Sequence, residues 1–189
     1  MLNLIAAIHG TGVAASTTSY ESIATVTVGA GGSSSIDFSS ISSTYTHLQL
    51  RYIARDNRSG TNSDDIMIRM NNDATTGNYN SHRLIGNGSS VSADRVTGFA
   101  GTLSAFVSAA TATANSFGAG VTDILDYANT NKYKTTRSIG GNDDNGSGFV
   151  SFISGLWLST SAVNRITVYP LNGTLFSQYS HFALYGIKG

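Results

Sequence analysis

The chain has 189 residues, which suits one domain with at most one appended segment, and it can bury about 70% of its unfolded surface. Charged residues make up only 12%, against about 25% in an average soluble domain, while Ser, Thr, Asn and 21 glycines supply much of the polar content. Eleven basic and eleven acidic residues cancel, so the composition argues against nucleic acid as a partner. With no cysteine, the chain has neither disulfides nor thiolate metal sites.

The N-terminal stretch MLNLIAAIHGTGVAAS holds an apolar run from Leu2 to Ile8. This run is far too short to span a membrane, and we expect no membrane partner. A secretory signal is the alternative, but the stretch has no basic n-region. We expect an arm over residues 1–19 that pairs with a neighbouring subunit, because exposure to water costs about 1.5 to 3 kcal/mol per large apolar side chain. Its apolar contacts would come from Leu2, Leu4, Ile5 and Ile8.

From Tyr20 onward, apolar and polar residues alternate with period two, which predicts half-buried β-strands. In the first segment, Ala24, Val26 and Val28 share one face, whereas Ile23 falls on the other with Thr25 and Thr27. Similar alternation predicts strands at 36–38, 47–52, 66–70, 121–127, 133–139, 149–157, 163–169 and 181–187.

Segments rich in Gly and Asx residues separate these strands, at 29–35, 56–63, 71–78, 86–92, 128–131, 140–148 and 170–173. The Ala-rich segment 99–115 also holds several Thr and Ser residues, which favour a loop or an extra strand over a helix. Many short strands without a helical period predict an all-β domain over residues 20–189, an antiparallel β-sandwich with the jelly roll as leading topology.

The stretch GGNDDNGSGF at 140–149 could hold a calcium ion or turn the chain. Aligned to a calcium loop, it has Asp143 and Asn145 at ligand positions, but Gly141 and Phe152 replace two of the strongest ligands. Asn145-Gly146 is typical of a type I′ hairpin turn, so we expect a hairpin with an exposed acidic tip. A weak ion remains a second hypothesis, held by Asp143 and Asp144, or by the acidic pair Asp64 and Asp65 in a similar loop context.

Other site chemistry is weak in the sequence. The histidines His9, His47, His82 and His181 are scattered without metal-ligand spacing. There is no nucleophile elbow and no complete phosphate-binding glycine motif, so we predict no catalysis and no cofactor. Asp123 and Asp126 are the only carboxylates expected as a pair on one strand, and their spacing of three places them on opposite faces. Trp157 could stack on a sugar, but its apolar surroundings favour a core position.

Four segments carry a resemblance to a known group of proteins. They are YESIATVTVGAGGSSSIDFSSISSTYTHLQLRYIAR at 20–55, DILDYANTNKYKTTRSI at 123–139, GLWLSTSAVNRITVYPLNG at 155–173 and FALYGIKG at 182–189. Together they resemble a group of tailed-phage virion structural proteins, frequent in viruses of cyanobacteria and other aquatic bacteria. The resemblance covers most of the chain after Tyr20, and it implies a place in the virion without choosing which.

The resemblance allows two roles, a capsid decoration (cement) protein or a tail fibre or tailspike component that binds the host surface. A chain with only about twenty residues before its β domain suits the cement role better. In that role we expect an oligomer, a homotrimer first, that contacts several copies of the major capsid protein at once on the capsid exterior. Weak contact with host glycans through a loop such as 56–65 fits either role.

Overall fold

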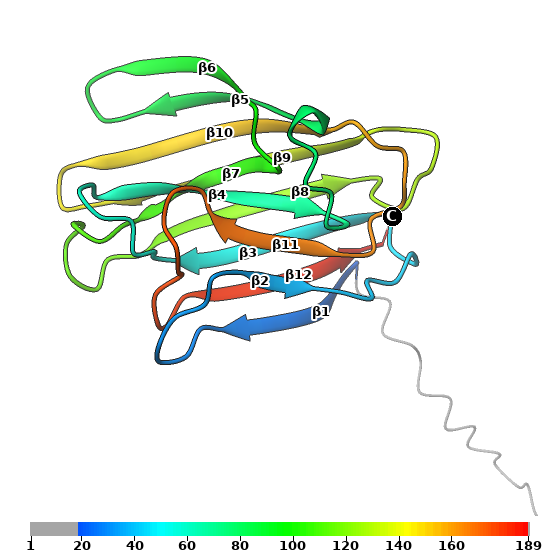
Figure 1. Cartoon of the computed structure of the whole chain (residues 1–189), viewed down its shortest axis with the longest axis horizontal. Helices are drawn as coiled ribbons and strands as arrows, with labels where there is room; N and C mark the ends of the chain where they lie inside the picture. The colour runs from blue at the N-terminus through cyan, green and yellow to red at the C-terminus, as the bar shows by residue number, and fades with distance from the viewer. Residues whose placement is uncertain (1–18, 189) are drawn as a thin grey trace, which may run out of the picture.

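The structure, a computed structural model, describes residues 19–188, and over this range the chain forms two antiparallel β-sheets. Figure 1 shows the four-stranded sheet lying across the larger, eight-stranded one. The strands of the large sheet are β1 (Tyr20–Thr27), β3 (His47–Ala54), β5 (Tyr79–Gly86), β6 (Val91–Thr97), β8 (Gly118–Leu125), β9 (Lys134–Asp143), β10 (Gly148–Trp157) and β12 (His181–Ile187). Those of the small sheet are β2 (Ile36–Phe38), β4 (Ser63–Met70), β7 (Thr102–Ser108) and β11 (Ile166–Pro170). The predicted all-β antiparallel sandwich is therefore confirmed.

The chain passes repeatedly between the two sheets. The large sheet has the order β1-β12-β3-β8-β9-β10-β5-β6, and the small one has the order β2-β11-β4-β7. The sheets hold eight and four strands, so the jelly-roll topology, which is built from eight strands, stays a prediction. A single turn of 3-10 helix, Thr76–Asn78, precedes β5. Within residues 19–188, no helix has the length and apolar character that crossing a membrane requires.

The main core lies between the two sheets. Alternate residues of β3, Leu48, Leu50 and Tyr52, point into it, as their period predicted. Trp157 is 2% exposed, which confirms its predicted core position, and it stacks on Tyr79 with ring centroids 6.3 Å apart.

Small residues let β7 approach the large sheet closely. A Cβ atom added to Gly140 would lie 2.8 Å from the Cβ of Ala105, and a Cβ atom added to Gly155 would lie 2.8 Å from the Cβ of Thr102. Side-chain hydroxyls also take part in this contact between β7 and the large sheet. The hydroxyl of Ser104 on β7 forms hydrogen bonds with Tyr52 Oη (2.7 Å) and with Thr122 Oγ1 (2.6 Å). The centre of the sandwich is thus partly built from small and hydroxyl-bearing residues, in keeping with the high Gly, Ser and Thr content.

Several strand predictions need correction. Strands β5 and β6 lie in a region where no strand was predicted, and β6 begins at Val91, inside a predicted turn. Strand β4 is not half-buried, because Met67 on its second face is as buried as Ile66 and Ile68. The ambiguous segment 99–115 contains β7, which confirms the preference for a strand or loop over a helix.

A bulge in β1 accounts for another correction. The register of β1 against β12 shifts between Ser22 and Ala24, and Ile23 packs against the core together with Ala24 and Val26. A strict period of two had placed Ile23 on the opposite face. The extra residue of a bulge reverses the alternation locally, so the prediction for Ile23 was wrong.

Candidate functional site

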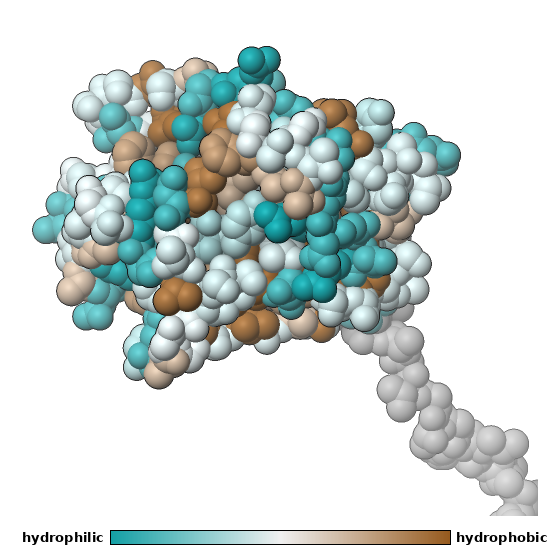
Figure 2. Space-filling model, in the orientation of Figure 1, coloured by the Kyte–Doolittle hydropathy of each residue, from teal (hydrophilic) through white to brown (hydrophobic). Residues whose placement is uncertain are grey.

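The outer face of the eight-stranded sheet, which points away from the small sheet, carries exposed apolar side chains. Six of them are between 48% and 72% exposed, and we call them the outer apolar patch: Ile53, Leu84, Val91, Ile139, Val150 and Phe152. With about half of each side chain exposed, they present roughly 600 Å² of apolar surface, the upper end of what a typical monomer shows. Figure 2 shows the other side of the molecule, where teal and near-neutral residues are interspersed with brown ones.

Strand register makes the patch continuous across the sheet. Phe152 is paired with Leu84 on one side and with Ile139 on the other. From β6 to β8 this row reads Ala93, Leu84, Phe152, Ile139 and Val121. The next row, from β6 to β3, reads Val91, Gly86, Val150, Gly141, Ala119 and Ile53. The patch is therefore a band two residues wide that runs across the strands.

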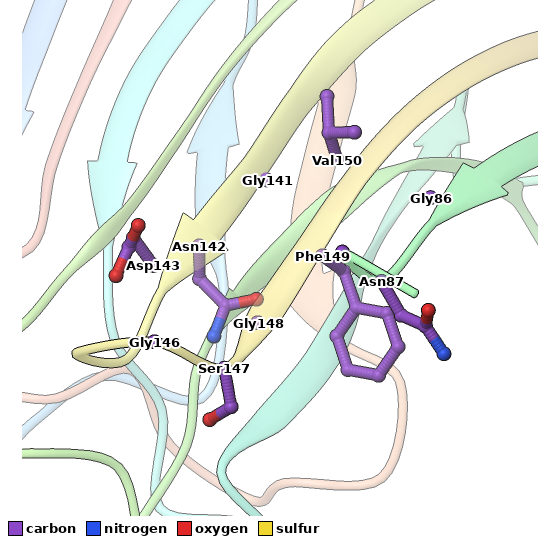
Figure 3. Close-up of a pocket in the computed structure, with 11 residues that line it drawn as sticks. Gly86, Asn87, Gly141, Asn142, Asp143, Gly146, Ser147, Gly148, Phe149 and Val150 are labelled. Carbon is purple, nitrogen blue, oxygen red and sulfur yellow. The ribbon is translucent and has the colours of Figure 1, made fainter. Parts of the chain in front are cut away.

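Two shallow hollows adjoin this band. One, of about 460 Å³, lies where the β9–β10 and β5–β6 hairpins end side by side, and Figure 3 shows Asn87, Asn142 and Phe149 around it. Glycines on both sides of Val150, Gly86 and Gly141, contribute no side chains to its lining. The second hollow, of about 390 Å³, is lined by residues of β5, β6 and β10 that include the patch members Leu84 and Phe152. The band is therefore uneven, with projecting side chains and adjacent recesses.

A row of polar residues runs beside the band on the same face. From β6 to β8 it reads Arg95, His82, Ser154, Arg137 and Asp123. Arg137 lies along its own sheet, because its Nη1 donates to Ser154 Oγ at 2.6 Å and to Thr136 O at 3.0 Å. The basic residues Arg95 and His82 lie toward the β6 end of this row, and Asp123 lies at the β8 end.

Beyond Asp123, the same face carries an aromatic and polar cluster. The guanidinium of Arg51 lies 5.5 Å from the ring centroid of Tyr20 and 5.3 Å from that of Tyr185. Its Nε donates to Gln49 Oε1 at 2.6 Å, and Gln49 Nε2 donates to Asp123 Oδ1 at 2.7 Å. An exposed aromatic ring beside amide, guanidinium and carboxylate groups is an arrangement that could contact a sugar.

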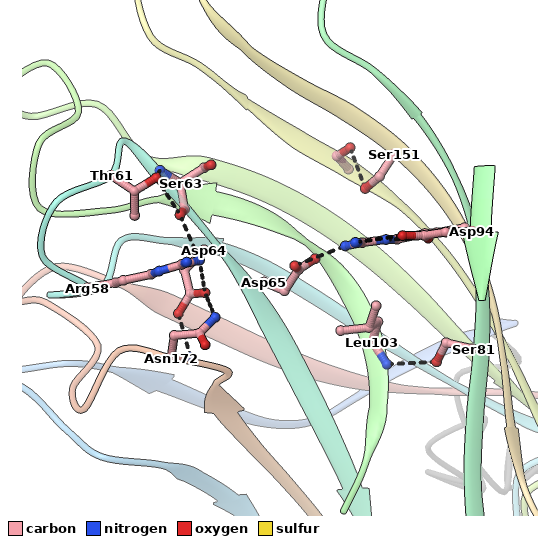
Figure 4. A network of polar contacts seen from close by, with 12 residues as sticks. Arg58, Thr61, Ser63, Asp64, Asp65, Ser81, Asp94, Leu103, Ser151 and Asn172 are labelled. Atoms are coloured by element: carbon pink, nitrogen blue, oxygen red, sulfur yellow. Dashed lines mark hydrogen bonds and ion pairs between the residues drawn. The ribbon is translucent and has the colours of Figure 1, made fainter. Parts of the chain in front are cut away.

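Two buried aspartates, Asp56 and Asp64, interact near the start of β4. Figure 4 shows the hydrogen-bond network around Asp64. Asp64 accepts hydrogen bonds from Arg58 Nη1 (3.0 Å), from the Nδ2 of Asn172 (2.8 Å) and from the backbone N–H of Gly173 (2.8 Å). Burial raises the pKa of Asp56 to about 8, and the neighbouring Asp64 carboxylate adds to this effect. For Asp64, burial acts in the same direction, but the hydrogen bonds from Asn172, Asp56 and Gly173 outweigh it and lower its pKa. The two pKa values are thus pushed apart, so in neutral solution a proton on this pair lies on Asp56 rather than on Asp64.

The structure corrects the expectation for the acidic pair Asp64 and Asp65. Both residues lie in β4 and are buried, so they are not part of an exposed loop. Donors already surround Asp64, and Asp65 Oδ2 accepts from Arg83 Nη1 at 3.1 Å. The loop 56–65 proposed for glycan contact likewise begins with the buried Asp56.

The β9–β10 turn matches its prediction in backbone and only partly in its side chains. Asn145 and Gly146 both have positive φ, 51° and 99°, as a type I′ turn requires. Asp143 is exposed, as expected for a tip. Asp144 is not a free tip residue, because it accepts hydrogen bonds from the Thr113 N–H and from Asn62 Nδ2.

The other predicted site residues lie apart from one another. Asp123 is on β8, whereas Asp126 follows the end of that strand at φ 48° and bonds Lys132, so the prediction that one strand carries both was wrong. Among residues 19–188, no three His, Cys, Asp or Glu side chains gather in a way that could hold a metal ion. The arm residues Leu2, Leu4, Ile5 and Ile8, and also His9, lie outside the described residues.

Sequence reasoning missed the outer apolar patch. Leu84 and Val91 belong to the two strands that were not predicted, so their neighbours could not be identified. Strand β10 did hold a signal, because Val150 and Phe152 on one face and Ile153 on the other are all apolar. A strand that is apolar on both faces is either covered on both sides or exposes apolar surface.

Comparison of the chain with protein-family models, with curated proteins and with solved structures found no match.

Proposed function

We propose that this chain is a bacteriophage virion structural protein, and specifically a capsid decoration protein that links neighbouring capsid subunits. The observation that carries the proposal is the outer apolar patch. An apolar patch at the upper end of the range for monomers is often functional, and on the face of a sheet it suits contact with another protein. The tailed-phage signatures in the sequence supply the virion context.

The low charge of the chain fits this role. Several aspartates of the sheets form ion pairs within the subunit, such as Asp94 with Arg83 at 2.7 Å and Asp37 with Arg165 at 2.9 Å. A contact made by apolar and hydroxyl-bearing residues buries few unpaired charges, whose desolvation would otherwise oppose assembly.

Attachment to the major capsid protein is assigned in this proposal to the N-terminal arm, residues 1–19. An oligomer carries one arm per subunit, so several weak contacts act together, and release from the shell requires them to fail at once. Leu2, Leu4, Ile5 and Ile8 would supply the apolar contacts of each arm. The outer apolar patch then serves contacts between the subunits of that oligomer rather than attachment to the capsid.

Copy number in the particle tests the proposal. Electron microscopy of virions that carry the protein should show it repeated over the capsid exterior, in register with the capsid lattice. Density confined to the tail would contradict the decoration role. In a binding assay with undecorated capsids, the full-length variant Leu4→Asp/Ile8→Asp should fail to decorate, while wild-type protein binds; equal binding by both would remove the arm from the proposal.

A second candidate function is host recognition as part of a tail fibre, and the cluster of Tyr20, Arg51 and Tyr185 is the observation that favours it. Aromatic rings and planar polar groups on one exposed face suit a polysaccharide ligand. Purified protein should then bind host cells or their surface polysaccharide, and Tyr20→Ala should weaken that binding. Binding to capsids without binding to host polysaccharide would reject this candidate.

A further inference from the structure

We propose that the outer apolar patch is a two-fold interface, and that the face of the large sheet that carries it packs against the same face of a second copy of this chain. This inference rests on the proposed function, because it names the partner of the surface on which that function depends. It replaces the homotrimer expected from the sequence with a dimer.

The size of the patch supports a protein partner. A stable interface buries about 800 Å² on each partner. The patch supplies roughly 600 Å² of apolar surface, and the adjoining polar row would form the rim. Two packed sheets keep their strands within about 30° of each other, which lets the whole band be covered at once.

Self-complementarity selects a second copy. A two-fold axis parallel to the strands, between β9 and β10, lays β10 on β9 of the second copy, β5 on β8 and β6 on β3. Residues at the same level along the strands then meet. Phe152 lies on Ile139 of the second copy, and Leu84 lies on its Val121.

The second row of the patch, from Val91 to Ile53, and the polar row also match across this two-fold axis. The projecting Val150 meets Gly141 of the second copy, where no side chain stands, and Val91 meets its Ile53. In the polar row, His82 lies opposite Asp123 of the second copy. The β6 end of the row in one copy, which carries Arg95 and His82, therefore faces the end of the row that carries Asp123 in the other copy. Each such contact occurs twice, because the axis relates the two copies.

Sedimentation of the full-length protein over a range of concentrations tests the interface. Wild type should form a dimer, whereas Ile139→Asp and Phe152→Asp should weaken dimerisation about a hundredfold, because a carboxylate would be buried without a partner. Both positions are about half exposed in the single chain, so the variants should keep the wild-type circular dichroism spectrum. The matched control is Tyr133→Asp, an equally exposed aromatic position in the β8–β9 loop outside the patch, which should dimerise like wild type.

A charge exchange tests the geometry itself. His82→Asp places two aspartates opposite each other, so this variant should weaken the dimer about tenfold. The double variant His82→Asp/Asp123→Arg should regain most of the affinity. Failure of the double variant to recover would overturn the proposed axis.

The dimer and the decoration role can fail separately. A wild-type monomer at every concentration, or a trimer unaffected by Ile139→Asp, would overturn the two-fold interface, even if the protein decorates capsids. A dimer that the patch variants dissociate would support the interface, even if no capsid binding is found.

Discussion

Lys134 joins two segments that are far apart in the sequence. Its side chain is fully buried, and its ammonium group donates to the carbonyl oxygens of Asn129 (2.6 Å), Lys132 (2.9 Å) and Thr160 (3.1 Å). Burial lowers the pKa of this amine because it removes water from the charged form. Hydrogen bonds to the three carbonyl oxygens stabilise the charged form in place of that water. This side chain therefore fixes how the segment after β8 packs against the segment after β10.

Replacing this ammonium should be costly. In Lys134→Met, three carbonyl groups lose their donor, and we expect a loss of about 3 kcal/mol in the free energy of unfolding, measured by urea denaturation. The control is Lys132→Met, because the Lys132 side chain is largely exposed and its ammonium group pairs with Asp126, a surface ion pair worth less than about 1 kcal/mol. Equal losses in the two variants would contradict the assigned role of Lys134.

At the scale of elements, the β9–β10 hairpin shows how turn residues fix strand register. Asp144 and Ser147 exchange backbone hydrogen bonds around Asn145 and Gly146, and the register pairs Gly148 with Asp143. That register places Phe152 beside Ile139, so the turn also determines how the outer apolar patch is built.

Gly146→Ala tests this turn. A Cβ at position 146 would contact nothing within 4 Å, so only the positive φ of 99° opposes the substitution. We expect a loss of about 1 to 2 kcal/mol in thermal or urea unfolding. Gly29→Ala is the matched control, since its Cβ is equally free and its φ is not positive, and its stability should change by less than about 0.5 kcal/mol. If Gly146→Ala is as stable as the control, the left-handed turn is not needed.

The sequence predicted those elements whose pattern is local. The NG turn, the core face of β3 and the core position of Trp157 follow from spacing alone. Strands β5 and β6 were missed because their residues alternate poorly: β6 is exposed on both faces, and Arg83 inside β5 is held by Asp65 and Asp94. Burial of both faces of β4, and of Asp64 within it, depends on segments distant in sequence, which a single strand's pattern cannot reveal.

The outer apolar patch is the clearest case of this limit. Its members come from five strands, β3, β5, β6, β9 and β10, which are not all consecutive in the chain, and sheet order and register make them neighbours. A reader of the sequence sees Val150 and Phe152 as ordinary strand residues. The candidate site therefore emerges from the topology rather than from any motif.

At the scale of the whole molecule, buried carboxyl groups give the stability a defined pH dependence. The pKa of Asp56 is raised to about 8 and that of Asp65 to about 6, in both cases chiefly by burial. At pH values between the ordinary aspartate pKa near 3.8 and these raised pKa values, the folded protein binds more protons than the unfolded chain. Their stabilising contributions are thus complete below about pH 4 and are lost as the pH rises through 6 and then 8.

Asp73 acts in the opposite direction. Burial alone would raise its pKa, but hydrogen bonds from Asn78, Trp157 and Thr75 lower it to about 2. The contribution of Asp73 is therefore present above about pH 4 and is lost as the pH falls through 2. Stability should be greatest in mildly acidic solution, near pH 4 to 5, and should decline on both sides.

The larger part of the alkaline decline can be assigned to one carboxyl group, Asp56, whose pKa is raised further than that of Asp65. Asparagine at position 56 can accept the Arg58 N–H that Asp56 Oδ1 accepts at 3.0 Å, and it can donate to Asp64 without needing a proton from solution. Melting temperatures of Asp56→Asn should therefore fall much less than those of wild type between pH 5 and 9, and the variant should be more stable at pH 9 by about 2 kcal/mol or more. Asp143→Asn, at the exposed turn, should keep the wild-type slope. Parallel pH profiles for wild type and Asp56→Asn would show that no proton lies on Asp56 in neutral solution, and that the alkaline decline arises elsewhere.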